Sequence, residues 1–461
     1  MKTTKRCIAQ FTFYDRTGIQ KYLETKAKEG WLLEKLSSFT WKFRRIEPKP
    51  IHYAVTYFPS ASVFDPEPTE QQRTFREFCQ HTGWQLAAAN GPLQIFYNEA
   101  EEPVPIETDP MTEIRTIHAS AKRNFLPSYV LLLAVAVMNL WIQVGQIISF
   151  PLTYLSQNTT LFNWLSIGIL AILSLQEILG YFLWYQKAKK VARLGEFVAT
   201  KGHRTFQLIL LGIDVAALGL LLCTMERRFA VVMGICLVSM FGVVVISLGI
   251  RELMKRMKLP RNTARNVTLG SIVVLSFAVT FGISFSMMEL VQWDIWEKEE
   301  QEYYEVQGMR FEEHHDELPL YVQDLVETDY DHYSCQLTEN RSLLISRVEG
   351  RQDVRVMEQG PELNYTVYEI HLPLLYNVCK EELFFWYDDW LSIDIYGNEV
   401  KDQYIGEDPA PWGAEEAYRL HNVVDAYNWY LLCYEDRLIT IQFDWEPTDA
   451  HKQIVAEKLG K

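Results

Sequence analysis

Five apolar stretches in the middle of the chain constrain its fold more than any other feature. Each is close to the ~20 residues that an α-helix needs to cross a ~30 Å hydrocarbon layer. Glu177 and Asp214 are the only charged residues within them. The sequence therefore predicts an integral membrane protein with a bundle of five transmembrane helices, at residues 129–148, 162–185, 206–224, 229–250 and 267–288.

The charged residues divide the chain into three unlike parts. Residues 1–110 carry 14 basic and 14 acidic residues, residues 111–288 carry 17 and 6, and residues 289–461 carry 13 and 39. The basic excess follows the second and fourth apolar stretches, whereas residues 150–161 carry no charge. Because positive charge beside a span marks the cytoplasmic side of a membrane, we expect a cytoplasmic N-terminus and an extracytoplasmic C-terminus.

The first hundred residues read as two copies of a strand–helix–strand–strand unit. The first copy has strands at 8–13, 31–36 and 40–46 and a helix at 18–29; the second has strands at 51–58, 84–89 and 93–98 and a helix at 71–81. Each helix ends at a glycine followed by a tryptophan, Gly30-Trp31 and Gly83-Trp84, and glycine tolerates the left-handed conformation of a helix stop. The pattern predicts a duplicated β-α-β-β domain of the α+β class with a six-stranded, mainly antiparallel sheet.

The same region resembles a bacterial family known as domain of unknown function 2812 (DUF2812). The residues that carry the resemblance span about the first hundred positions, and Lys26 departs from the pattern, where a methionine is common: Phe11, Asp15, Tyr22, Leu23, Ala27, Gly30, Trp31, Leu32, Phe43, Pro48 and Tyr53. The resemblance implies membrane spans behind the domain and a link to PadR-type transcription regulators. It implies no ligand and no reaction. The lack of net charge in this part argues against nucleic-acid binding.

The two acids within the apolar stretches are the best candidates for functional residues in the membrane. Carboxylates in lipid are costly and usually have a partner or a purpose. If Glu177 and Asp214 face each other from neighbouring helices at the same depth, they can share a proton or hold a cation. The alternative is structural: each acid is protonated and hydrogen-bonded to a neighbouring span, and helps the bundle to pack.

The C-terminal part predicts a third domain, also of the α+β class. We divide the chain into residues 1–110, a juxtamembrane segment 111–128, the bundle 129–290 and an acidic domain 291–461. Trp293 and Trp296 suit the membrane interface, and the helix is expected to continue over 294–307. Further helices are expected at 318–326 and 449–459, and strands at 342–348, 365–372, 391–396, 429–434 and 438–443, the last two joined by a turn at Glu435-Asp436.

Three groups in this domain have the residue types of a binding site without its spacing. The run 312–317, with His314 and His315, lacks the order of a zinc motif, and Asp329, Asp331 and His332 lack the order of a calcium loop. The aromatic run 384–390 can grip a sugar or a cation, but packing in a core is the simpler interpretation. Cys335, Cys379 and Cys433 allow at most one disulfide, and buried thiols are favoured. We expect no cofactor and no metal.

These features favour a regulatory or sensory membrane protein that couples an extracytoplasmic domain to a cytoplasmic one. No catalytic motif is found, so the chain is not expected to be an enzyme. Two alternatives stay open: a channel or transport component that uses Glu177 and Asp214, and an envelope enzyme with its site in the C-terminal domain. The oligomeric state cannot be derived from the sequence.

Overall fold

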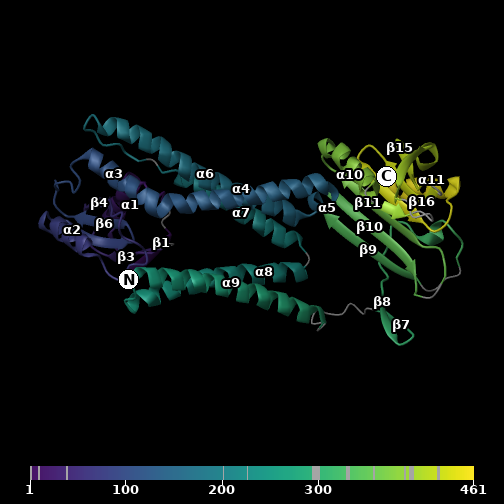
Figure 1. The fold of residues 1–461 in the computed structure, drawn as a ribbon, viewed down its shortest axis with the longest axis horizontal. Coiled ribbons are helices and arrows are strands. Elements are labelled where there is room, and N and C mark those ends of the chain that lie inside the picture. Colours follow the sequence, from purple (N-terminus) through teal and green to yellow (C-terminus); the bar gives the residue numbers. More distant parts are fainter. Residues whose placement is uncertain are drawn as a thin grey trace. The chain divides into compact units, whose positions relative to one another are not determined.

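The computed structural model describes residues 3–8, 11–37, 40–200, 202–225, 227–292, 302–328, 333–356, 359–388, 391–393, 399–422 and 426–461. It divides into two compact units (Figure 1). One consists of Met1–Asn139 and Ser166–Trp293, and the other of Leu140–Leu165 and Asp294–Lys461. The second unit therefore includes Leu140–Leu165, which contains the connection between the first two membrane helices.

In the described part of the chain, five helices are long and apolar enough to cross a membrane, so the chain is a multi-pass membrane protein. They are α4 (Leu126–Ser149), α6 (Asn158–Ala192), α7 (Arg204–Thr224), α8 (Arg227–Arg256) and α9 (Arg261–Gln292). Helix α3 (Pro110–Ser120) runs into α4 through the π-helical turn η1 (Ala121–Phe125). Helices α8 and α9 lie side by side (Figure 1). Each of the five predicted spans falls within one of these helices.

The N-terminal region contains two sheets of three strands. The first half is β1 (Thr4–Ile8), α1 (Arg16–Lys28), β2 (Trp31–Leu36) and β3 (Thr40–Arg45), and the second is β4 (His52–Tyr57), α2 (Glu70–His81), β5 (Gln85–Asn90) and β6 (Leu93–Asn98). The sheet orders are β1-β3-β2 and β4-β6-β5, all antiparallel. A single six-stranded sheet was therefore the wrong prediction. Strands β2 and β5 lie next to each other without forming a ladder.

The first strand also lies earlier than the predicted 8–13. Strand β1 pairs through Thr4–Ile8 with β3, and the described residues that follow it form a turn in which the Asp15 amide donates to the Thr12 carbonyl. The aromatic residues that suggested a strand pack against other side chains instead: the Phe13 ring stacks on the Phe125 ring with their centroids 4.7 Å apart. An alternating apolar pattern in so short a segment does not separate a strand from an aromatic loop.

The two helix ends follow the predicted glycine stops. Gly30 and Gly83 have φ values of +83° and +85°, which is the left-handed region that glycine adopts without strain. The following tryptophans differ in their surroundings. Trp84 is buried against Cys79 and Phe96, whereas the half-buried Trp31 ring lies beneath the Arg45 guanidinium, 5.0 Å from the ring centroid. Both residues act in packing.

The C-terminal domain is built on one antiparallel seven-stranded sheet of order β14-β15-β16-β17-β11-β10-β9. Its strands are β9 (Tyr333–Arg341), β10 (Ile345–Val354), β11 (Leu363–Ile370), β14 (Gln403–Glu407), β15 (Glu416–His421), β16 (Ala426–Cys433) and β17 (Arg437–Phe443). Helix α11 (Asp449–Leu459) packs in one apolar core and α10 (Tyr376–Asp388) in another. Two further antiparallel pairs lie outside this sheet: β7 (Glu302–Val306) with β8 (Met309–Glu313), and β12 (Leu391–Ile393) with β13 (Glu399–Lys401).

Several predictions for this domain are confirmed and two are wrong. The terminal helix, the turn at Glu435-Asp436 and the two strands that it joins occur as expected. The helix expected over 294–307 is wrong for its described part, because Glu302–Val306 is a strand that pairs with β8. The expected helix 318–326 is reduced to the 3₁₀ turn η2 (Val322–Asp324). Trp293, Trp296, Asp329, Asp331 and His332 lie outside the described residues.

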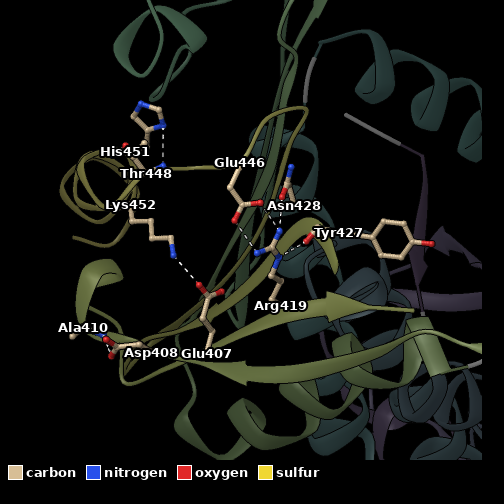
Figure 2. Close-up of polar contacts among 10 residues, drawn as sticks. All are labelled: Glu407, Asp408, Ala410, Arg419, Tyr427, Asn428, Glu446, Thr448, His451 and Lys452. Atoms are coloured by element: carbon tan, nitrogen blue, oxygen red, sulfur yellow. Dashed lines mark hydrogen bonds and ion pairs between the residues drawn. The ribbon is translucent and has the colours of Figure 1, made fainter. Parts of the chain in front are cut away.

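Paired charges anchor α11 and the loop before it to the sheet (Figure 2). The Arg419 guanidinium donates to both carboxylate oxygens of Glu446, at 2.8 and 2.6 Å, to Asn428 Oδ1 at 2.7 Å and to the Tyr427 carbonyl at 2.8 Å. Lys452, on α11, donates to Glu407 at 2.7 Å. Because both cations have anionic partners within the domain, this cluster acts as an internal anchor.

Candidate functional site

The N-terminal domain is fastened to the membrane helices at the first turn of α1. Asp15 is the N-cap of this helix, and its Oδ1 accepts hydrogen bonds from the Gly18 amide at 3.0 Å and from the Thr200 hydroxyl at 2.9 Å. Thr200 belongs to the segment between α6 and α7. The Thr17 amide donates to Thr200 Oγ1 at 2.9 Å, and the Thr200 amide returns a bond to Thr17 Oγ1 at 3.2 Å. This α1 latch satisfies a helix end with groups from the membrane bundle.

A glycine beside the α1 latch permits its close approach. A Cβ atom at Gly202 would clash with Asp15 Oδ2. The Asp15 carboxylate cannot turn away without losing its bonds to Gly18 and Thr200. The segment that joins α6 to α7 is thus shaped to receive this carboxylate.

An aromatic cluster continues the contact along α6. Tyr14 is 2% exposed, and its ring lies 5.4 Å from Trp184 and 5.8 Å from Tyr181. A Cβ atom at Gly180 would lie 2.8 Å from the Tyr14 hydroxyl oxygen, so a small residue is needed there. Burial, with further contributions from Glu177 and Asp15, raises the pKa of Tyr14 to about 12. Tyr14 is therefore a neutral packing residue at physiological pH.

Helix α3 contacts both α1 and α6, and the linker adds a contact to α1. Arg16 forms an ion pair with Glu113 of α3 at 2.7 Å and lies 3.9 Å from Glu107 of the linker. Burial, and the nearby Glu113 charge, raise the pKa of Glu107 to about 7, against the opposing effect of Arg16. His118 Nδ1 lies 2.6 Å from the Tyr181 hydroxyl oxygen. Helix α3 is thus joined both to α1 and to α6.

The two acids of the membrane helices have separate partners. Glu177 is 5% exposed and accepts a bond from Gln207 of α7 at 2.6 Å, whereas Asp214 accepts one from Ser166 of α6 at 2.6 Å. Gln207 and Asp214 are seven residues apart on α7, a separation of ~10 Å along the helix axis. The two acids therefore lie at different positions along the helices and share no hydrogen-bond partner among the described residues, and both bonds join α6 to α7.

The C-terminal domain holds the connection between the first two membrane helices. Helix α5 (Pro151–Leu155) inserts Leu152 and Leu155 into the apolar core formed with Ile345 and Leu383. The Leu152 amide donates to Glu382 Oε2 at 2.6 Å, and the Ser342 hydroxyl donates to the Leu155 carbonyl. These contacts form the α5 anchor. Asn158, the first residue of α6, adds a bond to the Arg341 carbonyl at 2.9 Å.

Glu382 is the ionisable group of the α5 anchor. It is 8% exposed, and burial raises the pKa of its carboxyl group to about 7, although the bond from the Leu152 amide and the Arg347 charge act in the opposite direction. The carboxyl group therefore changes charge near neutral pH, at the point where the membrane loop enters the domain.

Most of these residues were not predicted as functional. Asp15 appeared only in the family resemblance, and an Asp three residues before Gly18 is a recognisable capping signal. Glu382 has no sequence signal, because its burial depends on a loop more than 200 residues away. Of the predicted groups, Glu313 pairs with Arg355 at 2.6 Å, and His315 forms an isolated bridge with Cys335. Phe384 packs on Tyr404 and Tyr418, as the simpler interpretation expected.

Neither a metal cluster nor a disulfide is found in the described ranges. They contain no group of three His, Cys, Asp or Glu side chains that could hold a metal ion. All seven cysteines are free thiols, and Cys379 and Cys433 are buried in the core beside α5.

Residues 15–129 match the family model described as Protein of unknown function (DUF2812). The match confirms the resemblance seen in the sequence. It begins at Asp15 and ends at Tyr129 in α4, so it includes the N-terminal domain from α1 onward, without β1, together with the linker and α3. No curated protein and no solved structure matches the chain. The matched residues thus include the α1 side of the latch, and Thr200 lies beyond them.

Proposed function

We propose that this protein is a regulatory or sensory membrane protein in which helix α6 couples the C-terminal domain to the N-terminal domain. The observation that carries the proposal is the distribution of contacts on this one helix. Its first residue bonds to Arg341, and the segment after its last turn carries Thr200 of the α1 latch. A continuous helix of 35 residues, ~52 Å long, transmits a shift or rotation along its axis.

The proposal includes a cytoplasmic N-terminal domain and an extracytoplasmic C-terminal domain. The N-terminal domain bonds to both basic connections, through Thr200 and through Arg261, which donates to the Ser60 carbonyl at 3.0 Å. The C-terminal domain bonds to the uncharged connection that contains α5. Because basic connections stay in the cytoplasm, these contacts support the assignment. Reporter fusions at the two termini test it, and activity of both fusions in the same compartment would contradict it.

We further propose that the N-terminal domain arose by duplication. The two halves have the same order of elements, and in both sheets the third strand lies between the first and the second. Both helices stop at a glycine with positive φ before a tryptophan. In this proposal the domain is a non-enzymatic binding module, free of nucleic-acid contact, and a PadR-type regulator is the partner suggested by the family resemblance.

Transport through Glu177 and Asp214 is the second candidate. It is favoured by one observation: in the described part of the chain, Glu177 Oε2 is buried and lacks a hydrogen-bond partner. The bonds of Glu177 to Gln207 and of Asp214 to Ser166 favour the structural alternative, because each joins two neighbouring helices. Measurement of ion flux in proteoliposomes before and after the changes Glu177→Gln and Asp214→Asn distinguishes the two.

Hydrogen exchange in the full-length protein tests the coupling. The double variant Leu152→Ala/Leu155→Ala removes two buried side chains from the α5 anchor and should also increase exchange in peptides that cover 195–203, around Thr200. The change Thr200→Val should in turn increase exchange in α5, because coupling between two sites is reciprocal. The control is Leu131→Ala, at an exposed position on α4. Increased exchange confined to the mutated end would refute the coupling.

A further inference from the structure

A pocket lies between the second half of the N-terminal domain and the end of helix α8. It has a volume of about 330 Å³ and is lined by Gln72 and Arg76 of α2, the Asn90-Gly91 turn and Lys255 of α8, together with part of the loop 61–68. Pockets of this size accommodate a small molecule or a lipid headgroup. Lys255 is the residue before the last one of α8, so the pocket is at the end of a membrane helix.

The pocket presents two cations that form no ion pair with any described residue. Arg76 is half-buried, and among the described residues its guanidinium donates one side-chain hydrogen bond, from Nε to Gln94 Oε1 at 3.0 Å. Burial lowers the pKa of Arg76, and among the described residues the side chain forms no ion pair. Within the same ranges no carboxylate lies within 4 Å of the Lys255 ammonium group, although Glu252 and Asp65 are near enough to act on it electrostatically. A half-buried guanidinium without an anion is costly to maintain.

The acidic residues of the pocket are already engaged. Glu67 pairs with Arg73 at 2.9 Å and with Lys258 at 2.6 Å. Asp65 accepts a bond from the Ser62 amide at 2.6 Å and lies 3.8 Å from Arg261. The lining itself has two basic and two acidic side chains, and the two acidic ones pair with Arg73, Lys258 and Arg261 from outside it. Because other cations neutralise both acids, Arg76 and Lys255 are the charged groups of the pocket that can bind an anion.

We infer that this pocket binds a phosphate group. The planar guanidinium of Arg76 offers donors that match phosphate oxygens, and Lys255 adds a second charge-assisted bond. Two sources share this chemistry: the headgroup of an anionic phospholipid, which can reach the pocket from the bilayer surface, and a soluble phosphate-bearing molecule. The inference is independent of signal transfer along α6.

Native mass spectrometry of the full-length protein in detergent tests the lipid source, with dioleoylphosphatidylglycerol compared with zwitterionic dioleoylphosphatidylcholine. Equilibrium binding of radiolabelled inorganic phosphate tests the soluble source. We expect one saturable site for at least one probe. The double variant Arg76→Gln/Lys255→Gln should weaken that site by at least tenfold, since each lost charge-assisted bond accounts for about a tenfold change in affinity.

The matched control is Lys187→Gln/Lys190→Gln, which removes two exposed charges from the basic end of α6. It should change the affinity less than twofold. If the pocket variant unfolds, Lys255→Gln alone and Arg76→Lys provide the comparison, because both keep part of the site. Saturable binding of phosphatidylglycerol alone assigns the pocket to a lipid headgroup, and binding of phosphate assigns it to a soluble ligand. Absence of saturable binding for both probes, or an equal loss in the control, would overturn the inference.

Discussion

The change Glu382→Gln tests the electrostatics of the α5 anchor. Burial raises the pKa of Glu382 from 4.5 to about 7, a difference equivalent to about 3 kcal/mol. Because the folded state binds the proton more tightly than the unfolded state, stability falls as the pH rises from about 4.5 to about 7 and stays low above this range. Glutamine keeps a side-chain oxygen that can accept the hydrogen bond from the Leu152 amide, and it removes the carboxyl group that titrates. The variant should therefore match the native protein near pH 4.5 and exceed its stability by up to about 3 kcal/mol at pH 8.

Hydrogen exchange of α5 and α10 in the full-length protein in lipid nanodiscs, corrected for the intrinsic rate at each pH, measures this difference. Native protein should lose protection of both helices between pH 5 and pH 8, and the Glu382→Gln variant should keep it. Glu381→Gln is the matched control, because Glu381 is the exposed neighbour on the same helix. If the variant lost protection at pH 8, the ionised carboxylate would be the stabilising form, and the reasoning from burial would be refuted.

Two further perturbations address the N-terminal domain. Gly202→Ala places a Cβ against Asp15 and should destabilise the α1 latch by about 1–2 kcal/mol, which would be measured as faster hydrogen exchange over residues 16–20. The control Gly212→Ala, at an open position on α7, should leave this exchange unchanged. Equal effects of the two changes would contradict the steric argument. Raising the pH from 6 to 8 should ionise Glu107 beside Glu113 and increase proteolysis of the linker 99–110. Glu107→Gln should remove this pH dependence and Glu101→Gln should not, so a pH dependence that persists in the Glu107 variant would show another group to be responsible.

Local signals account for the features that the sequence predicted well. The apolar stretches, the glycine stops at Gly30 and Gly83 and the helix ending at Leu459 depend on residues near one another in the chain. The order of the seven-stranded sheet does not, because β11 pairs with β17 across about 70 residues. Helix α10 was missed since its apolar residues form a run, Leu383 to Phe385, that resembles an aromatic patch as much as a helix face.

The same limit explains why the functional contacts were missed. Asp15, Thr200 and Glu382 bond to partners between 185 and 230 residues away. No spacing rule connects such positions. The acids Glu177 and Asp214 were noticed because a charge in an apolar stretch is a local anomaly, yet their partners Gln207 and Ser166 are ordinary polar residues. Sequence reasoning thus finds unusual residues more readily than it finds the contacts that use ordinary ones.

A membrane loop can lack charged residues for two physical reasons: it is translocated across the membrane, or it is buried in the core of a folded domain. Residues 150–161 are uncharged, which suggested translocation, but Leu152 and Leu155 are also core residues of a folded domain and would exclude charge there on either side of a membrane. The basic residues of the other connections also fall into two groups, those that bond to a folded domain and those that do not. Lys258 and Arg261 bond to groups of the N-terminal domain, whereas Lys187, Lys189 and Lys190 are exposed and form no ion pair among the described residues. Because folding does not account for these three lysines, they are the strongest argument for a cytoplasmic N-terminal domain.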